Sequence, residues 1–269
     1  MDTENTKFSY IYPKLPAAIR TTAFVRFSGS GLANCLFVYA RAIKQLLTHG
    51  GALITPTWAN LSLGPYIRHQ QDKRHYLGLF SSTGEISGIR KLLILLICKR
   101  RIKVVEGLDP YFADLLDNAK EISRYIENHV KPQILISVKE YDFSNCVALH
   151  IRMGDYPEKF RVPISWYLMK IDELKKVNPG YKFLIFSDGS DQELEELLSV
   201  PNVKRVFFGN AIADIFAISK CCYMIGSDST FSGWGAFLGQ VPCVFYRKHF
   251  GPVLKDGPYE IVENKENLW

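Results

Sequence analysis

Short apolar runs alternate with helix-like segments along the second half of the chain, and this alternation constrains the fold more than any other sequence feature. The runs expected as strands are 147–151, 181–186, 203–208, 223–225 and 241–245. The segments expected as helices are 164–177, 191–198, 212–220 and 231–238. Strands that alternate with helices pair in parallel and carry helices on both faces of the sheet. This half therefore predicts a Rossmann-like α/β fold.

The first half shows the same alternation in a weaker form. Strands are expected at 23–27, 52–55 and 102–105, and helices at 34–47 and 111–130. The stretch between 56 and 100 holds Pro, Gly and many charges, so we expect loops there with one or two helices. A chain of 269 residues is long enough for two domains. We expect them at 1–140 and 141–269, the second being the clearer.

Composition narrows the class of protein. Hydrophobic residues make up 47% of the chain and charged residues 22%, as in ordinary globular proteins. The net charge of +6 is spread along the chain, which fits an anionic substrate or an acidic membrane surface but predicts no nucleic-acid partner. The six cysteines form no C-x-x-C pair and no cluster with histidine, so no metal site is expected. We expect reduced thiols in the cytoplasm.

The most apolar run, Leu92–Ile97, has basic residues on both sides. Six residues are too few to span a bilayer, which takes about 20. Two interpretations stay open. The run is a buried element with charged ends, as short apolar runs usually are, or it rests on an anionic membrane surface. Since residues 1–10 resemble neither a secretory signal nor a transit peptide, we expect a cytoplasmic protein, with peripheral contact at the inner membrane face as the alternative.

Polar clusters follow several expected strands, at the sheet edge where α/β proteins bind ligands. They lie at 28–31, 150–155, 187–189 and 226–230. In the second cluster, Arg152 is suited to bind a phosphate with two parallel hydrogen bonds and to stabilise a departing diphosphate. Asp155 is expected to orient Arg152 or His150. A structural Arg–Asp pair at a strand end is the alternative.

Three further positions are candidates for nucleotide-sugar binding. Ser229 and Thr230 precede a helix, whose N-terminal N–H groups favour phosphate, although an N-cap role is equally compatible. The glycines and alanine of that helix should let it pack close to the sheet. Asp188 is suited to accept hydrogen bonds from a guanine edge, a ribose or an acceptor sugar.

The first turn contains G-x-G without the third glycine of a dinucleotide site, so no NAD site is expected. Gly31 and Asn34 in this turn suit the close approach of a nucleotide or sugar. An N-cap role for Asn34 is the alternative. The sequence also lacks a P-loop and a D-x-D motif, and the latter argues against a metal-dependent transferase.

Several segments carry motifs of one family in the family's order. The segment 31–40 is similar to G-L-G-N-Q-L-F-Q-Y-A, and 150–156 is similar to H-x-R-R-G-D-Y. The others are 162–167 (V-P-x-x-Y-Y), 186–189 (F-S-D-D), 214–221 (D-x-x-L-M-S-x-C) and 228–236 (N-S-T-F-S-W-W-G-A). Together they resemble the α-1,2-fucosyltransferases of glycosyltransferase family 11.

The resemblance implies a GT-B-like α/β fold of two Rossmann-like halves with mostly parallel sheets. It implies an inverting, metal-independent transfer of L-fucose from GDP-fucose, with no cofactor, to a galactose-containing glycan in glycan or surface polysaccharide synthesis. The N-terminal domain is then the acceptor side, and the C-terminal domain binds the nucleotide sugar. The catalytic residues would be Arg152 and Asp155. The donor-binding residues would be Gly31, Asn34, His150, Arg152, Asp188, Ser229, Thr230 and Phe231.

The chain also departs from the family motifs. Met153 replaces the second Arg, Gly189 the second Asp, and Asp228 an Asn. Loss of the second Arg would weaken donor binding, change the donor or abolish activity. Two alternatives therefore stay open: a transferase using a different sugar nucleotide, or a non-catalytic protein that binds a nucleotide sugar or glycan.

Overall fold

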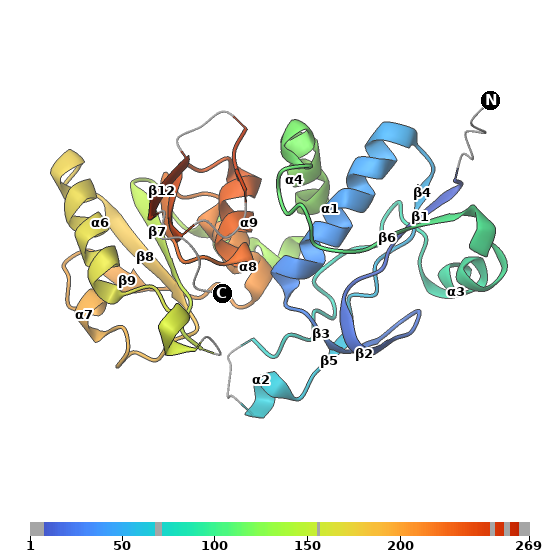
Figure 1. The fold of residues 1–269 in the computed structure, drawn as a ribbon, viewed down its shortest axis with the longest axis horizontal. Coiled ribbons are helices and arrows are strands. Elements are labelled where there is room, and N and C mark those ends of the chain that lie inside the picture. The colour runs from blue at the N-terminus through green and yellow to red at the C-terminus, as the bar shows by residue number, and fades with distance from the viewer. Residues whose placement is uncertain (1–7, 68–71, 155–156, 248–250, 256–258, 264–269) are drawn as a thin grey trace. The chain divides into compact units, whose positions relative to one another are not determined.

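The computed structural model describes residues 8–67, 72–154, 157–247, 251–255 and 259–263. The chain divides into two compact units, Met1–Gln133 and Ile134–Trp269, drawn in Figure 1. The division lies before the boundary expected after residue 140, because helix α5 (Ile136–Glu140) belongs to the second unit. Within the described part of the chain, no helix is both long enough and apolar enough to cross a membrane.

The second unit is built on one parallel sheet with the order β12-β11-β10-β7-β8-β9. Its strands are β7 (Cys146–Ile151), β8 (Lys182–Ser187), β9 (Val203–Arg205), β10 (Tyr223–Gly226), β11 (Cys243–Arg247) and β12 (Tyr259–Glu263). The chain moves outward from β7 through β8 to β9, then returns to place β10 on the other side of β7. This is the strand order of dinucleotide-binding folds, and its switch point lies between β7 and β10.

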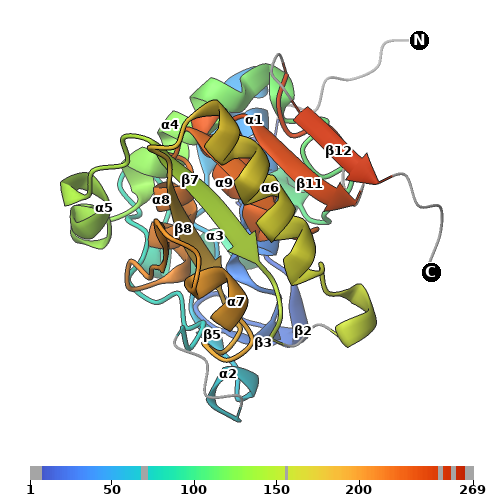
Figure 2. The ribbon, with the colours of Figure 1, turned by 90° about the vertical axis from the view of Figure 1, so that its left-hand side faces the viewer.

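Helices cover both faces of this sheet, as Figure 2 shows. They are α6 (Ile164–Val177), α7 (Glu195–Leu198), α8 (Ala211–Ile218) and α9 (Thr230–Gly239), with the short turn η4 (Glu158–Phe160). Alternate residues of β7, Val147, Leu149 and Ile151, share a core with Trp166 of α6 and Leu197 of α7. The residues between them point to the opposite face, where α8 and α9 lie, so the period of two in β7 separates the layers.

Most elements expected in the second unit are present, with shifted ends. Helix α6 begins and ends where the sequence predicts. Helix α7 is shorter than the expected 191–198, and turns occupy the residues before it, where the Glu193 side chain accepts hydrogen bonds from the Ser190 N–H and hydroxyl. The small-residue face of α9 packs on α8 rather than on the sheet. A Cβ added at Gly235 would lie 2.3 Å from Ile218 Cγ2, and one at Gly239 would lie 2.1 Å from the Ser219 carbonyl oxygen.

The first unit contains two small sheets. One has the parallel order β4-β1-β6, and the other has the order β2-β3-β5, with β2 and β3 antiparallel. The strands are β1 (Tyr10–Pro13), β2 (Ala17–Thr21), β3 (Arg26–Gly29), β4 (Ala52–Leu53), β5 (Asn60–Leu61) and β6 (Ile102–Val105). The helices are α1 (Leu32–His49), α2 (Gly64–Ile67), α3 (Gly88–Ile97) and α4 (Ala119–His129), with short turns η1 (Lys99–Arg101), η2 (Leu116–Asn118) and η3 (Pro132–Ile134).

Sequence expectations fare less well in this unit. The strand expected at 23–27 begins only at Arg26, and β1 and β2 were not expected. The helix expected at 111–130 is limited to α4. Its first part forms turns instead, and Tyr111 adopts a positive φ of 55°, which is incompatible with a helix.

Candidate active site

The switch point of the second sheet brings together the carboxyl ends of β7 and β10. Gly226 of β10 is the register partner of His150 of β7, and the Ser227 N–H donates to the His150 carbonyl at 2.9 Å. Beyond this pair, β7 runs into the loop at 152–154 while β10 runs into α9. Because the two connections diverge here, this is where such folds bind ligands.

His150 joins the two strand ends through its side chain. Its Nδ1 lies 2.5 Å from Ser232 Oγ and 3.2 Å from Ser227 Oγ, and its ring stacks on Phe231 at 4.8 Å. The residue is 6% exposed, and burial lowers its pKa to about 3. At neutral pH the ring is therefore uncharged. It acts as a support for the start of α9 rather than as a cation for phosphate.

Asp188, at the end of β8, holds the loop that follows β7. Arg152 Nη1 donates to Asp188 Oδ2, while the N–H groups of Met153 and Gly154 donate to Oδ1 at 2.9 and 3.1 Å. A Cβ added at Gly154 would lie 2.4 Å from Oδ2, so this close approach requires glycine. The carboxylate thus fixes both the backbone of the loop and the direction of the Arg152 guanidinium.

The observed partner of Arg152 is therefore Asp188. Asp155, the residue expected to orient it, lies outside the described residues. The side chains of Arg152 and Asp188 are 22% and 21% exposed, so solvent still reaches the pair. A guanidinium carries five N–H donors in a planar fork whose geometry suits phosphate.

Helix α9 begins with the expected cap. Ser229 is its N-cap, and its Oγ accepts a hydrogen bond from the Phe231 N–H at 3.3 Å. Thr230 is the first residue of the helix. Helix N-termini carry partial positive charge and favour anions. Capping and anion binding are compatible, so both interpretations of this segment persist.

Asp228 stands directly before this cap; the sequence marked it as a departure from the family motif but gave it no role in the site. Its Oδ1 accepts a hydrogen bond from the Arg247 N–H at 2.7 Å, and its Oδ2 lies 3.7 Å from Arg247 Nη1. Oδ2 is buried and has no hydrogen-bond partner among the described residues. Burial raises the pKa of Asp228 to about 6. The Asp228 carboxyl, which is costly to ionise, thus adjoins the N-terminus of α9, the helix end expected to bind phosphate.

The sequence signal for these missed residues was the strand end itself. Ser227 and Asp228 lie inside a polar cluster that was recognised, and Arg247 ends β11 in the same way that Arg205 ends β9. Ser232 gave no such signal, because its position within the helix conceals its contact with His150. Three-dimensional proximity across 82 residues of sequence was needed to find it.

Two departures from the family motifs lie in contact. Met153 is 5% exposed and belongs to the core between the sheet and α6. A Cβ added at Gly189 would lie 3.2 Å from Met153 Sδ and 3.3 Å from its Cβ. The two positions at which the motifs carry Arg and Asp therefore hold an apolar side chain over a glycine in this chain.

Gly31 and Asn34 belong to the first unit. Gly31 is the N-cap of α1, and a Cβ added there would meet nothing within 4 Å. Asn34 lies in the first turn of α1, so its proposed N-cap role is wrong. The Leu32 N–H donates to the Tyr76 hydroxyl at 2.8 Å. The other described candidates, His150, Arg152, Asp188, Ser229, Thr230 and Phe231, all come from the β7, β8 and β10 ends of the second unit.

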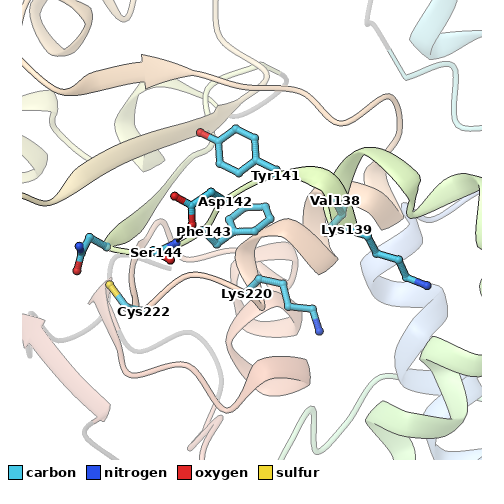
Figure 3. Close-up of a pocket in the computed structure, with 9 residues that line it drawn as sticks. Val138, Lys139, Tyr141, Asp142, Phe143, Ser144, Lys220 and Cys222 are labelled. Carbon is cyan, nitrogen blue, oxygen red and sulfur yellow. Dashed lines mark hydrogen bonds between the residues drawn. The ribbon is translucent and has the colours of Figure 1, made fainter.

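The pocket in Figure 3 lies elsewhere in the second unit. It measures about 550 Å³ and is lined by the segment before β7 and the turn before β10, including Tyr141, Asp142 and Lys220. These segments enter the amino ends of the strands, opposite the end that bears Arg152. Among the described residues, no group of three or more His, Cys, Asp or Glu side chains is placed to hold a metal ion.

Comparison with solved structures shows the fold. One similar structure is that of the NodZ α-1,6-fucosyltransferase co-crystallised with GDP. The match covers 94% of this chain and 100% of the NodZ chain, at 14% sequence identity and a TM-score of 0.56. The match to POFUT1 in complex with GDP covers 95% of this chain and 98% of the POFUT1 chain, at 10% sequence identity and a TM-score of 0.51. The fold is GT-B-like α/β with mostly parallel sheets, which confirms the expected fold class.

Sequence comparison shows the family. The O-antigen biosynthesis glycosyltransferase WbnK of Escherichia coli is 31% identical over 160 residues. The match covers 52% of this chain and 53% of that protein, so the chain spans about half the length of this relative. The family description Glycosyl transferase family 11 matches residues 110–245, a segment that contains all the candidate residues of the second unit. The chain thus belongs to glycosyl transferase family 11.

Proposed function

We propose that this chain is a glycosyltransferase that moves L-fucose from GDP-fucose to a galactoside hydroxyl, forming an α-1,2 linkage. The observation that carries the proposal is the Arg152–Asp188 pair beside the switch point of a dinucleotide-type sheet. Family membership and a fold shared with fucosyltransferase structures support it. By its name, the Escherichia coli relative acts in O-antigen biosynthesis, which supports an acceptor that is part of a surface polysaccharide.

The proposed reaction is a single displacement without a metal or other cofactor. The acceptor oxygen forms a bond to the anomeric carbon of fucose as the bond from that carbon to the phosphate oxygen breaks, which inverts the configuration. GDP departs with the electron pair of the broken bond. In this proposal, Arg152 and the N-terminus of α9 stabilise this charge, which is larger in the transition state than in the ground state.

A base must accept the proton of the acceptor hydroxyl. The candidates we propose are Asp155 and Glu158, two carboxylates that follow β7 in the sequence. Asp188 is less suited, because both of its oxygens already accept hydrogen bonds from Arg152 and the loop backbone. We propose that Asp188 acts as a positioning residue, which contributes to donor binding through Arg152.

The two units receive different proposed roles. The second unit binds the donor, through His150 and Phe231 as supports and Ser229 and Thr230 at the phosphate. The first unit binds the acceptor, and Gly31 and Asn34 at the start of α1 are the residues of that unit that we propose for donor binding. The cytoplasmic location expected from the sequence belongs to the same proposal.

The contact between Met153 and Gly189 favours one alternative, a transferase that uses another sugar nucleotide. The motifs carry Arg and Asp at these two positions, next in sequence to Arg152 and Asp188, and their replacement by Met and Gly lowers the polarity beside that pair. A chain that had simply lost its activity would have no reason to keep the Arg152–Asp188 arrangement, which makes the non-catalytic alternative the weaker one.

The first experiment measures GDP release by the purified chain in EDTA, with GDP-fucose, GDP-mannose or UDP-galactose as donor and galactosides such as lactose as acceptors. The product is checked by mass and linkage analysis. We expect turnover with GDP-fucose alone and an α-1,2-linked product. Turnover restricted to another donor would assign the alternative transferase, and donor binding without turnover across the acceptor panel would favour the non-catalytic protein.

Arg152→Ala is expected to lower kcat by about a hundredfold or more, the effect of losing one preorganised charge-stabilising donor. Arg161→Ala is the matched control, since Arg161 also pairs with a carboxylate of the second unit, that of Glu193 at 2.7 Å. The control should stay within about threefold of the unaltered chain, and both variants should unfold at the same urea concentration as that chain. Near-full activity of the folded Arg152 variant would refute its assigned role.

A further inference from the structure

Helix α3 exposes most of its large aliphatic side chains. Ile89 is 75% exposed, Leu93 49%, Leu96 60% and Ile97 76%, and Leu92 lies at the edge of the same surface at 36%. These positions recur every three or four residues, so they form one stripe along the helix. The stripe, called the α3 stripe below, is an apolar face that the described part of the first unit leaves uncovered.

The opposite side of α3 attaches the helix to the first unit. Ile94 is 7% exposed and packs with Tyr12, Ile54 and Ile86. Lys91 on this side is 3% exposed, and its Nζ donates to Thr57 Oγ1 at 3.0 Å. The helix thus buries a lysine and exposes leucines and isoleucines. The expectation that the run 92–97 is a buried element is therefore wrong, and Figure 1 places α3 at the margin of its unit.

The charges around the α3 stripe all have one sign. Between residues 86 and 105 the sequence has six Lys or Arg residues and no Asp or Glu. Arg90 is exposed within the helix, and Lys99, Arg100 and Arg101 are exposed in the turn η1 that follows it. The apolar stripe is therefore bordered by positive charge.

We propose that the α3 stripe docks on an anionic lipid bilayer, with the aliphatic side chains in the interface and the basic residues among the lipid headgroups. An apolar face flanked by Lys and Arg is the pattern of helices that lie in the plane of a membrane surface. With ten residues, α3 is too short to cross the bilayer. A second copy of the chain fits the stripe poorly, because a two-fold interface would bring identical positive borders together.

This docking would hold the first unit against the membrane. If the proposed function is right, the unit assigned to the acceptor would then face glycans that are carried on lipids. That consequence rests on the proposed function, whereas the docking itself does not. The two are separable because membrane binding is measured without donor or acceptor.

The experiment measures co-sedimentation of the full chain with vesicles of phosphatidylcholine alone or with 30% phosphatidylglycerol. We expect binding to the anionic vesicles at low salt that weakens as salt rises. Leu96→Ser with Ile97→Ser should lower the partition coefficient about tenfold, and so should Lys99→Glu with Arg100→Glu. Since these side chains are exposed, the variants should fold like the unaltered chain, which circular dichroism and urea unfolding check.

The matched control is Ile136→Ser with Val177→Ser, two apolar side chains of the second unit that are 51% and 76% exposed. Its binding should stay within about twofold of the unaltered chain. Three results would overturn the proposal: no binding to anionic vesicles at low salt, equal loss of binding in the control, or a dimer in lipid-free sedimentation that the Leu96 and Ile97 substitutions abolish.

Discussion

The two units place their buried polar groups differently. In the second unit, all six residues of β7 are buried. Three of the five buried polar side chains that the structure describes in this unit, His150, Ser227 and Ser232, gather at the ligand end of the sheet and bond to one another. In the first unit, charged side chains lie within the core itself. Arg26 is fully buried, and Lys91 is 3% exposed.

The buried charged groups of the first unit form hydrogen bonds with neutral local partners. Arg26 donates to the carbonyl oxygens of Thr57 and Pro16 at 2.8 and 2.6 Å. The buried Glu85 carboxylate accepts a hydrogen bond from the Tyr39 hydroxyl at 2.6 Å. Such groups cost desolvation and fix a particular arrangement. The difference teaches that the second unit keeps its apolar core separate from its polar site, whereas the first unit uses charge to hold its framework.

The largest expected effect on stability tests the separation seen in the second unit. Met153→Arg places a guanidinium in the apolar core beside Gly189 and should lower the free energy of unfolding by about 3 kcal/mol, since an unpaired buried charge is strongly destabilising. Gly189→Asp alone should also destabilise, because its Cβ would crowd Met153 at 3.2 Å. The double variant restores the Arg and Asp of the family motifs. Its loss of free energy of unfolding should be much smaller than the sum of the losses in the two single variants.

Urea unfolding of the four chains gives this coupling directly. We expect a favourable interaction of about 2 kcal/mol between the two substitutions. Strictly additive losses would show that the two positions changed independently. A coupled result would instead explain why this chain departs from the motifs at both positions.

The same contrast between the units explains what the sequence could predict. In the second unit, uniformly buried strands alternate with helices, so β7, β8, β10 and α6 were predicted from apolar runs alone. The candidate site followed from the rule that ligands lie at the carboxyl ends of strands. The Arg152–Asp188 pair was not predicted, because it joins loops that are 36 residues apart.

In the first unit, α1 and β6 lie where the sequence predicts them, but elsewhere the same signals fail for physical reasons. Apolar periodicity marks a core only where the core is apolar, and here Lys91 is buried while Leu96 is exposed on the same helix. Strands of two residues, such as β4 and β5, give no alternation to detect. The fold of this unit depends on contacts such as that between Arg26 and Thr57, which no local pattern encodes.

Lys91→Met tests the cost of charge in the first core. Burial lowers the pKa of Lys91 from 10.5 to about 8. Between these values the unfolded chain binds more protons than the folded chain, so the stability of the unaltered chain rises with pH across this range. Below pH 8 the buried charge costs about 3 kcal/mol. Replacing Lys91 by Met removes this cost, and loss of the hydrogen bond to Thr57 offsets part of the gain. The Lys91→Met variant should therefore have a free energy of unfolding about 2 kcal/mol higher than the unaltered chain at pH 7.

The gain should shrink as the pH approaches 10.5, and urea unfolding of both chains at pH 7 and pH 10 measures it. Lys99→Met is the matched control, because Lys99 is exposed at the end of the same helical segment and should change stability little at either pH. A loss of stability in Lys91→Met at pH 7 would mean that the bond to Thr57 outweighs the cost of burying the charge.

Asp228→Asn is the smallest expected effect and has the opposite dependence on pH. The folded chain keeps the proton of Asp228 up to a pKa of about 6, whereas the ordinary value is 3.8. Because the folded chain binds more protons in between, the stability of the unaltered chain falls as pH rises through this range. Asn cannot ionise, so it should stabilise by about 1 kcal/mol at pH 7 and have no effect at pH 4.

Two features leave ionisation as the main difference between Asp and Asn at this position, and both can be checked. The position of Oδ2 lacks a hydrogen-bond partner among the described residues, so the Asn amide placed there is left equally unsatisfied. The hydrogen bond from the Arg247 N–H to Oδ1 is kept by Asn. A gain at pH 7 that persists unchanged at pH 4 would show that ionisation of Asp228 is not its cause. A gain confined to neutral pH, together with a lower KM for the donor, would show that the carboxylate opposes anion binding at the start of α9.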